Sequence, residues 1–495
     1  MDKLIELHSA VPRLPHMRLA APADFLLSRG EHVAITGLNA SGKTLLVNML
    51  TGKSLLAGGS AFFHRAEAIR YLPFRDAYGT ADASYYYQQR WNMGDQGELQ
   101  TVCGSLGLCS DAKLRDELIQ LFDFEQIIDK PLIYLSSGEL RKFQLMKALF
   151  AQPEVLILDN PYIGLDASTR QSLTALLQRL SEQQKTSLIL VTPLMDDIPQ
   201  FITHVYQMKD KVCLPRQTRG EYLAQLDMSS FERKNSSEMV EAILQLPVGQ
   251  AAWPASDWDK DKDKALPQVV KMDRVGLRYG QRTILQDLDW EIRAGERWAL
   301  SGENGAGKSA LLSLVCADNP QAYACRITLF GRRRGSGESI WEIKRHIGYI
   351  SPEMHRAYMK NYPAIDIVAS GLHDSIGLYV RPRPEDYATC EFWMKVFGIE
   401  LLRDRPFLEL SSGEQRLCLL ARAFVKDPSL LILDEPLHGL DSACRTRVRS
   451  IIECFCRRAG KTLVMASHYR EELPPCIHKE LVLFKDHSYH VSPLG

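Results

Sequence analysis

The sequence lacks the features that mark several common classes of protein. No apolar run is long enough to cross a bilayer, and Met1 to Glu6 do not form the basic-then-apolar pattern of a secretory signal. The 60 basic and 60 acidic residues leave no net charge, so no global basic field indicates a nucleic-acid partner. The 11 cysteines include no C-x-x-C pair, which disfavours zinc sites and indicates reduced thiols. We therefore expect a cytoplasmic protein, peripheral at the inner membrane if it has a membrane partner.

Two glycine-rich segments fit the pattern G-x-x-x-x-G-K-[ST], whose backbone N–H groups cradle phosphates. They consist of Gly37, Leu38, Asn39, Ala40, Ser41, Gly42, Lys43 and Thr44, and of Gly302, Glu303, Asn304, Gly305, Ala306, Gly307, Lys308 and Ser309. Each follows a short apolar run and precedes a helical pattern, which places phosphate at a helix N-terminus that favours anions. We expect Lys43 and Lys308 to contact phosphates, and Thr44 and Ser309 to contact Mg²⁺. The sequence thus predicts two sites for ATP and Mg²⁺.

The two halves of the chain repeat one series of motifs. After each glycine-rich loop comes Leu-Ser-Ser-Gly-Glu, at 135–139 and 410–414, and then an apolar strand that ends in Asp159 or Asp434. Gly-Leu-Asp follows at 164–166 and 439–441. Because order and spacing hold through four motifs, we interpret the chain as a duplicated α/β domain. We predict a first domain at 1–215, a linker at 216–266 with a short helix near 236–246, and a second domain at 267–495.

This series of motifs resembles the ATP-binding cassette (ABC) ATPase family over nearly the whole chain. The resemblance implies an α/β fold of two tandem P-loop NTPase domains. Each would have a parallel-sheet core, an antiparallel β part and a helical part that carries the Leu-Ser-Ser-Gly-Glu signature. It also implies head-to-tail pairing, in which each nucleotide lies between the P-loop of one cassette and the signature of the other.

The signature residues that would meet the nucleotide are Ser136, Ser137 and Gly138 in the first cassette and Ser411, Ser412 and Gly413 in the second. We expect each to precede a helix, which in the first cassette begins near Glu139, so that exposed N–H groups reach a phosphate across the interface. The alternative for one signature alone is an ordinary helix N-cap with a capping acid.

The second cassette has a full set of catalytic candidates. Asp434, which ends the Walker B strand, would hold Mg²⁺, and Glu435 is placed to orient or deprotonate the attacking water. The family resemblance implies that His468 contacts the γ-phosphate and that Tyr279 stacks on adenine. Packing at a strand end for Tyr279 and a loop position for His468 are the alternatives. Where the family has a glutamine loop, Glu353 could contact Mg²⁺ or its water.

The first cassette departs from this pattern. Asn160 follows Asp159 where the second cassette has a glutamate, and an amide cannot take a proton near neutral pH. Pro193 stands at the histidine position, Phe74 stands in the glutamine loop, and only His8 is a weak candidate for the adenine-stacking position. The loop residues and Asp159 remain, so we predict that both cassettes bind nucleotide and that only one hydrolyses it.

Head-to-tail pairing assigns the signatures crosswise. The first composite site combines Lys43, Thr44, Asp159 and Asn160 with 411–414. The second composite site combines Lys308, Ser309, Asp434, Glu435 and His468 with 136–139. We predict turnover at the second composite site and holding of nucleotide at the first.

A longer run in the second cassette, from Ile327 to Ser351, resembles the ModF (PhrA) type of tandem ATP-binding proteins, which are associated with molybdate transport. This resemblance implies a separate membrane permease subunit as partner, besides the intramolecular pairing of the two cassettes. A non-transport ATPase that acts on ribosomes or DNA stays open as the alternative. We interpret Arg332 to Arg334 as a solvated hairpin tip flanked by glycines. Contact with nucleic acid and docking of a partner's acidic segment are the alternatives.

Overall fold

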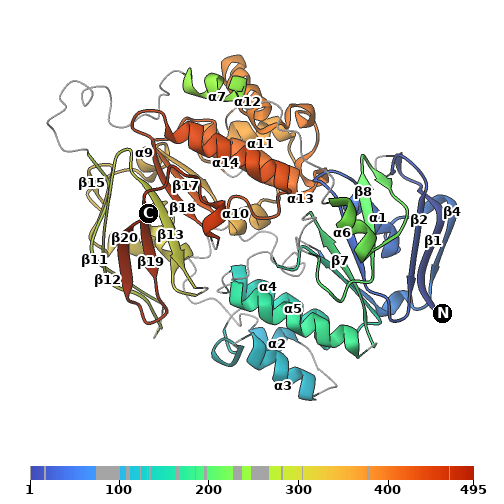
Figure 1. Ribbon diagram of the computed structural model, residues 1–495. Helices are drawn as coiled ribbons and strands as arrows, with labels where there is room; N and C mark the ends of the chain where they lie inside the picture. The colour runs from blue at the N-terminus through green and yellow to red at the C-terminus, as the bar shows by residue number, and fades with distance from the viewer. Residues whose placement is uncertain are drawn as a thin grey trace.

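The computed structural model describes most of the chain. It covers residues 2–15, 18–73, 101–106, 112–122, 124–130, 132, 135, 137–162, 167–183, 185–193, 198–226, 237–246, 267–279, 282–303, 305–375, 380, 382–467 and 469–494. Figure 1 shows the first cassette on the right and below, in blue to green, and the second cassette on the left and above, in yellow to red. No helix of this described part is long and apolar enough to span a membrane.

The first cassette contains two sheets and the helices around them. The antiparallel sheet has the order β2-β1-β4, and the larger sheet has the order β10-β8-β3-β7-β6-β5 with β9 beside β8. Its strands are β1 (Lys3–Pro12), β2 (Ala23–Ser28), β3 (Val33–Thr36), β4 (Leu56–Phe63), β5 (Ile69–Leu72), β6 (Val155–Asp159), β7 (Ser187–Thr192), β8 (His204–Lys209), β9 (Val212–Cys213) and β10 (Gln217–Thr218). Its helices are α1 (Lys43–Leu50), α2 (Val102–Leu106), α3 (Ala112–Leu121), α4 (Ser137–Phe150), α5 (Ala167–Glu182) and α6 (Arg219–Leu226). β3, β6 and β7 are apolar and almost wholly buried, as a parallel sheet covered on both faces requires.

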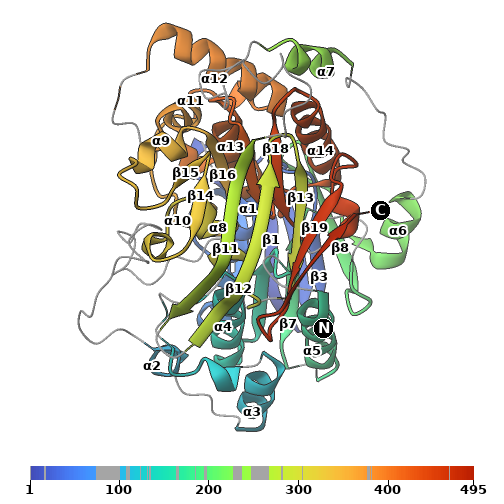
Figure 2. The same ribbon diagram turned by 90° about the vertical axis from the view of Figure 1, so that its left-hand side faces the viewer.

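The second cassette repeats this plan. Its antiparallel sheet has the order β12-β11-β14-β15 and its larger sheet β16-β17-β18-β13-β19-β20, which repeats the parallel order β5-β6-β7-β3-β8 of the first cassette. The strands are β11 (Gln268–Tyr279), β12 (Arg282–Arg293), β13 (Arg297–Gly302), β14 (Ile327–Leu329), β15 (Arg332–Arg333), β16 (Ile347–Ile350), β17 (Leu430–Asp434), β18 (Thr462–Ala466), β19 (Lys479–Leu483) and β20 (Tyr489–Pro493). The helices are α8 (Lys308–Val315), α9 (Ile340–Lys344), α10 (Pro352–Ala357), α11 (Ala364–Ala369), α12 (Pro384–Phe397), α13 (Ser412–Phe424) and α14 (Ser442–Cys456). Figure 2 shows β11, β12, β13 and β19 from their outer side.

The duplication extends to an irregularity in the first strand of each cassette. Ser9 and Arg274 both have positive φ, at 45° and 46°. The backbone N–H of Ser9 donates to Asp24 Oδ1 at 2.8 Å, and that of Arg274 donates to Asp289 Oδ1 at 2.7 Å. Such bulges bend a strand and shift its register. The shared bulge therefore pairs Ser9 with Arg274, and the residues between the bulge and the P-loop correspond one to one in the two cassettes.

The expected linker at 216–266 is partly taken up by structure that belongs to the cassettes. β10 pairs with β8, and the Tyr222 hydroxyl in α6 accepts from Thr36 Oγ1 of β3 at 3.1 Å. The expected helix near 236–246 is α7 (Ser237–Leu244), whose Ile243 is fully buried in the core of the second cassette beside α14. The described ends of this interval are thus attached to opposite cassettes.

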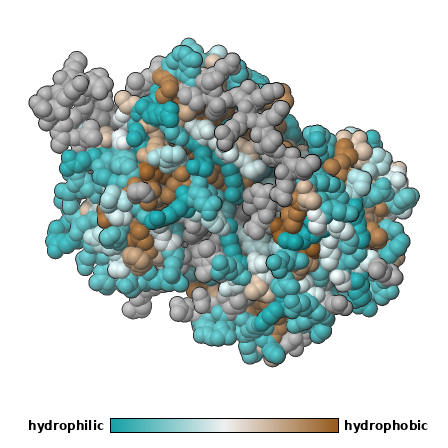
Figure 3. Space-filling model, in the orientation of Figure 1, coloured by the Kyte–Doolittle hydropathy of each residue, from teal (hydrophilic) through white to brown (hydrophobic). Residues whose placement is uncertain are grey.

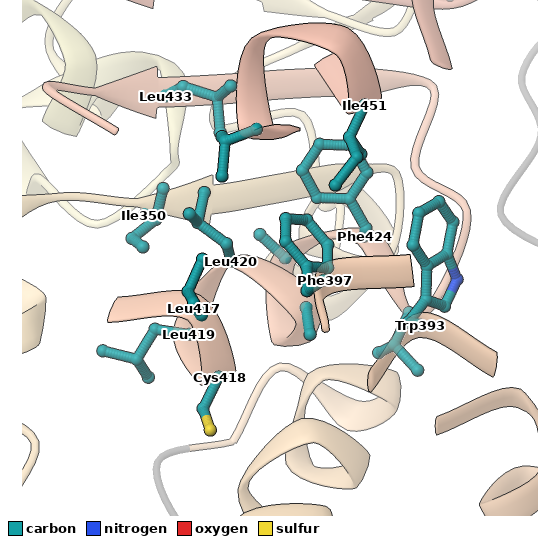
Figure 4. Close-up of a cluster of buried hydrophobic side chains, with 14 of the residues drawn as sticks. Ile350, Trp393, Phe397, Leu417, Cys418, Leu419, Leu420, Phe424, Leu433 and Ile451 are labelled. Atoms are coloured by element: carbon teal, nitrogen blue, oxygen red, sulfur yellow. The ribbon is translucent and has the colours of Figure 1, made fainter. Parts of the chain in front are cut away.

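The helical part of the second cassette is fixed by an aromatic cluster. Trp393 and Phe397 of α12, Phe424 of α13 and Phe455 of α14 are buried together, and Figure 4 shows the first three pointing toward one another beside Ile451. The ring centroids of Phe424 lie 5.2 Å from Trp393 and 5.0 Å from Phe455. Burial of each such side chain contributes about 1.5–3 kcal/mol. This packing holds the signature helix α13 against the sheet. Unlike this apolar core, most of the surface seen in Figure 3 is hydrophilic.

Candidate functional site

Both glycine-rich loops connect a central parallel strand to a helix. Gly37 to Thr44 join β3 to α1, and Gly302 to Ser309 join β13 to α8, with Asn304 outside the described residues. A Cβ on Gly37 would lie 2.3 Å from the carbonyl oxygen of Met208, and one on Gly302 would lie 2.3 Å from that of Leu483. Only glycine fits these two positions, where φ is +149° and +138°.

The helix that follows each loop begins without a side-chain cap. Gly42 and Gly307 are the N-cap residues, both left-handed with φ 100°, and neither α1 nor α8 receives a side-chain hydrogen bond at its N-cap. The N–H groups of a first helical turn need acceptors. The hydroxyl of Ser41 is also buried without a hydrogen-bond partner among the described residues. These donors fit a phosphate group in the loop.

The two loop lysines fold back over their own loops. Lys43 Nζ donates to the carbonyl oxygens of Gly37 at 2.7 Å and Leu38 at 2.8 Å. Lys308 Nζ donates to the carbonyl oxygen of Glu303 at 3.1 Å. Burial lowers the pKa of Lys43 to about 8, although Asp159 and Asp441 partly oppose this shift. A phosphate group would restore the charged form by supplying a nearby anion.

The second Walker B strand, β17, delivers two carboxylates to the edge of the sheet. Asp434 is 6% exposed, and Glu435 follows with a positive φ of 49°. Burial, and then the neighbouring carboxylates of Glu435 and Glu353, raise the pKa of Asp434 to about 8. A divalent cation would relieve this repulsion. The described ranges contain no group of three or more His, Cys, Asp or Glu residues that could hold a metal ion. A Mg²⁺ ion bound with nucleotide at Asp434 would take further oxygen ligands from Ser309 and the phosphates.

The first Walker B strand, β6, has the same backbone and different chemistry. Asn160 has a φ of 49°, equal to that of Glu435, and its Nδ2 donates to Asp159 Oδ1 at 2.9 Å. The Tyr71 hydroxyl donates to Asp159 Oδ2 at 3.3 Å, and burial together with that carboxylate raises the pKa of Tyr71. A backbone in this sparsely populated region costs about 1–3 kcal/mol. Both cassettes keep the strained turn, while only the second keeps a carboxylate on it.

Strand register identifies the position of the missing histidine. Asp159 pairs with Val191, and Asp434 pairs with Ala466. Counting onward from these pairs, Pro193 occupies the place of His468, as the sequence predicts. His468 itself lies outside the described residues.

The signature helices begin earlier than expected. α13 begins at Ser412 and α4 at Ser137, so a start near Glu139 is wrong by two residues. In the second cassette Ser411 is the N-cap and forms a capping box with Glu414, at 3.3 Å and 2.7 Å, which moves the start forward. The capping alternative is therefore also present, and because Ser411 accepts from the N–H of Glu414, the N–H groups of Ser412 and Gly413 are the ones left for a ligand. Ser136 lies outside the described residues.

Contacts between the cassettes bring the first P-loop to the second signature. The backbone N–H of Asn39 donates to Asp441 Oδ2 at 2.9 Å. A Cβ on Gly413 would lie 2.2 Å from Asn39 Nδ2, so signature and loop are in close contact. Asp441 also caps α14 by accepting from the backbone N–H of Cys444 at 2.8 Å. This is the crosswise arrangement that the first composite site requires.

An arginine in each signature helix was not anticipated from the sequence. Arg141 Nη2 donates to the carbonyl oxygen of Asp159 at 2.7 Å, and Arg416 Nη2 donates to that of Asp434 at 3.1 Å. Arg141 and Arg416 are 3% and 2% exposed. Each therefore ties the signature helix to the end of the Walker B strand. The repeat could have revealed them, because both follow the signature closely in the sequence.

The position expected to stack on adenine differs between the cassettes. The hydroxyl of Tyr279 accepts from Asn319 Nδ2 at 2.8 Å, and its ring packs partly buried at the end of β11. Counting from the shared bulge, Leu14 is its equivalent in the first cassette, and it is 49% exposed. His8 is not, because it lies before the bulge with its exposed ring 3.4 Å from Asp24. The prediction that His8 occupies the adenine-stacking position of the first cassette is therefore wrong, and Leu14 occupies it.

The three consecutive arginines do not form one solvated patch. Arg334 is buried, pairs with Glu338 at 2.6 Å and lies 4.5 Å from the ring centroid of Tyr323. Arg332 pairs with Glu342 at 2.5 Å. The interpretation as a solvated hairpin tip is thus wrong for Arg334, which is structural.

Comparison with known proteins decides the family. The model of the ABC transporter family matches residues 21–163 and 285–438, one region in each cassette. The chain belongs to this family. It is 36% identical over 474 residues to the ABC transporter ATP-binding protein ModF of Escherichia coli K12, covering 93% of this chain and 92% of that protein. An uncharacterized ABC transporter ATP-binding protein of Schizosaccharomyces pombe is 28% identical over 92% of both chains. The tandem ABC ATPase assignment and its resemblance to the ModF type are thereby confirmed.

Solved structures share the tandem fold. An archaeal ABCE1 from a model of ribosome-bound Pelota and ABCE1 matches with a TM-score of 0.61 and 17% identity, covering 98% of this chain and 78% of that chain. The archaeal ribosome recycling factor aABCE1 matches with a TM-score of 0.53 and 18% identity, covering 98% and 90%. At these identities the likeness concerns the fold alone, and it confirms two tandem ABC domains.

Proposed function

We propose that the chain binds two ATP molecules with Mg²⁺ and hydrolyses only the one at the second composite site. The observation that carries the proposal is the contrast after the two Walker B strands. Glu435 follows Asp434 in the second cassette, whereas Asn160 donates its amide to Asp159 in the first. A carboxylate can accept the proton of an attacking water, and an amide cannot.

The residues of the second composite site divide the work of hydrolysis. Lys308 and the first turn of α8 bind the phosphates. Ser309 with Asp434 would hold Mg²⁺, which would neutralise charge on the phosphates. Glu435 orients the water and accepts its proton, and His468 contacts the γ-phosphate. Tyr279 would lie beside adenine, and Glu353 would contact Mg²⁺ or its water. The signature 136–139 supplies N–H groups from the other cassette.

The first composite site holds nucleotide without turning it over. Lys43, Thr44 and Asp159 provide phosphate and Mg²⁺ contacts, and Ser411, Ser412 and Gly413 supply the opposing signature. Held nucleotide would favour the paired state of the cassettes, because a ligand that bridges both is bound only when they are together.

Analysis of the bound nucleotides tests this division. After wild-type protein turns over ATP with Mg²⁺ and is separated rapidly from free nucleotide, chromatography of the extract should find ATP and ADP in about equal amounts. The Glu435→Gln variant should retain two ATP and no ADP. Extracts that contain only ADP from the wild type would show that both sites hydrolyse.

For the cellular setting we propose service to a membrane transporter through a separate permease subunit. The similarity to ModF supports this setting. The resemblance of 327–351 to the ModF type, which is associated with molybdate transport, extends the proposal to molybdate uptake. Affinity purification of the Glu435→Gln variant from solubilised membranes should recover an integral membrane permease. Cells without the protein should accumulate less molybdenum, measured by mass spectrometry. Normal accumulation and no permease would contradict the transport proposal.

The alternative setting is a non-transport ATPase acting on ribosomes or DNA. The tandem fold shared with ABCE1 is compatible with it. Co-sedimentation of the Glu435→Gln variant with ribosomes, at the salt concentration where free protein stays in the supernatant, would favour the ribosome. Binding to duplex DNA at low salt, where phosphate contacts are strongest, would favour DNA.

A further inference from the structure

His438 lies between the candidate catalytic base and the opposite cassette. Its Nδ1 is 2.5 Å from Glu435 Oε2, and its Nε2 is 2.7 Å from Nη2 of Arg170, which belongs to α5 of the first cassette. The side chains of His438 and Glu435 are only 10% and 14% exposed. We propose that His438 is a positioning residue for Glu435, and that Arg170 sets its tautomer only when the two cassettes are paired. The inference rests on the proposed function, in which Glu435 is the base.

The chemistry of the three groups fixes the direction of both hydrogen bonds. A guanidinium has only donors, so Arg170 donates and Nε2 of His438 must be the acceptor. The imidazole is then neutral with its proton on Nδ1, an assignment that follows from the hydrogen-bond network. Nδ1–H donates to Oε2 of Glu435. The bond holds one carboxylate oxygen and so orients the other toward the water.

Arg170 is itself fixed against the second cassette. Its guanidinium lies 4.7 Å from the ring centroid of Tyr469 and donates to the Tyr469 hydroxyl. Tyr469 directly follows His468, so this docking point adjoins the proposed γ-phosphate contact. On its own side, Arg170 stands in the first turn of α5, just after the Gly-Leu-Asp motif of the first cassette. An arginine on a facing aromatic ring gains a cation–π interaction.

The arrangement belongs to one composite site. Arg445 takes the same place in α14 that Arg170 takes in α5, yet its Nε donates within its own cassette, to the carbonyl oxygen of Leu440 at 3.0 Å. The repeat places Ile163, outside the described residues, where the second cassette has His438. An isoleucine has no ring nitrogen, so only the second composite site can use this relay.

The consequence is a link between pairing and catalysis. When Arg170 is withdrawn, Nε2 loses its donor, and His438 can turn its proton away from Glu435. The base then loses its fixed orientation. Pairing would therefore complete the hydrolytic site through His438, in addition to delivering the signature.

Steady-state kinetics of variants in the full chain test the inference. We expect His438→Ala to lower kcat at least about tenfold with KM for ATP within about twofold, the pattern of a lost positioning group. Arg170→Ala should lower kcat similarly. The matched control is Arg179→Ala on the same helix, which is 54% exposed and pairs with Glu117 in its own cassette, and its kcat should match the wild type.

A double-variant comparison separates tautomer control from docking. The side-chain amide of Asn in His438→Asn donates an N–H to Glu435 and has no tautomer for Arg170 to set. This variant should therefore recover part of the kcat lost in His438→Ala. In that background, Arg170→Ala should change kcat less than about twofold. An equal loss from Arg170→Ala in both backgrounds, or wild-type kcat in His438→Ala, would overturn the inference. Glu435→Gln in the same assay reports on the proposed function: if that variant stays active, the proposed function fails, whatever His438 does.

Discussion

Asn39 and Asp441 are hydrogen-bonded although 402 positions separate them in the sequence. The backbone N–H of Asn39, in the first P-loop, donates to Asp441 Oδ2 at 2.9 Å, just before α14 of the second cassette. The same asparagine lies against Gly413 of the second signature. One residue of the first loop thus touches two motifs of the other cassette, so the first composite site depends on pairing.

The contact between Gly413 and Asn39 predicts a site-specific loss of binding. Gly413→Ala places a Cβ 2.2 Å from Asn39 Nδ2, so the Asn39 side chain must move away from the second signature. Alanine suits a helix better than glycine, so the fold should not be destabilised. We expect ATP to bind the first composite site about tenfold more weakly, a loss of about 1.4 kcal/mol, in equilibrium dialysis. Gly220→Ala in α6, with open space around it, is the control, and equal affinity of both variants would contradict the contact.

Gly302 should tolerate no side chain. Gly302→Ala combines a φ of +138° with a Cβ 2.3 Å from a backbone carbonyl oxygen, and backbone cannot yield as a flexible side chain can. We expect loss of ATP hydrolysis and a decrease in the free energy of unfolding of at least about 1–3 kcal/mol. Gly276→Ala in β11 is the control, because its Cβ would lie 3.7 Å from the nearest atom, an ordinary contact. Its free energy of unfolding and its rate of ATP hydrolysis should stay close to those of the wild type. Denaturant titration and phosphate release measure both, and a fully active Gly302→Ala would refute the close approach.

Nucleotide binding at the first composite site should take up a proton at alkaline pH. Burial lowers the pKa of Lys43 to about 8, so the amine is increasingly neutral above pH 8. A bound phosphate raises this pKa again, because an anion favours the charged form. Affinity should therefore fall as pH rises above about 8, by up to about tenfold per pH unit. Calorimetry of a Lys308→Ala variant at pH 9, in buffers with different ionisation enthalpies, should detect proton uptake, which should vanish at pH 6.5.

The first composite site should gain ATP hydrolysis when glutamate and histidine are introduced at the positions of Asn160 and Pro193. Asn160 and Glu435 share a φ of 49°, so glutamate fits the backbone at position 160. In a Glu435→Gln background, we expect Asn160→Glu with Pro193→His to raise phosphate release at least about tenfold, because a base is restored. Asn160→Gln with Pro193→His is the control without a base. No difference between the two, with ATP still bound, would mean that the first composite site lacks more than these residues.

The features of the fold that depend on short local motifs could be predicted from the sequence. Both glycine-rich loops, the strands that end in Asp159 and Asp434, and the duplicated α/β architecture follow from short motifs and their order. Prediction was poorer where side chains compete locally. The first signature helix begins at Ser137 and not near Glu139, and a bulge at Ser9 removed His8 from the position of Tyr279.

Contacts across the pair of cassettes could not be predicted in this way. Arg170 lies 268 positions from His438, and neither residue belongs to a motif that names the other. Such contacts depend on how two folded units dock, which no periodicity or spacing in the chain records. The burial of Arg334 in a three-arginine run has a different origin, because its partners Glu338 and Tyr323 belong to its own cassette and composition does not reveal such pairing.

Steady-state ATP hydrolysis by the wild type beside Glu435→Gln tests the central claim most directly. The account predicts near-complete loss of phosphate release in Glu435→Gln, with two ATP still bound per chain, since Asn160 cannot serve as a base. Retention of about half of the wild-type rate would mean that the first composite site turns over by itself, and the division into one hydrolytic and one holding site would be wrong.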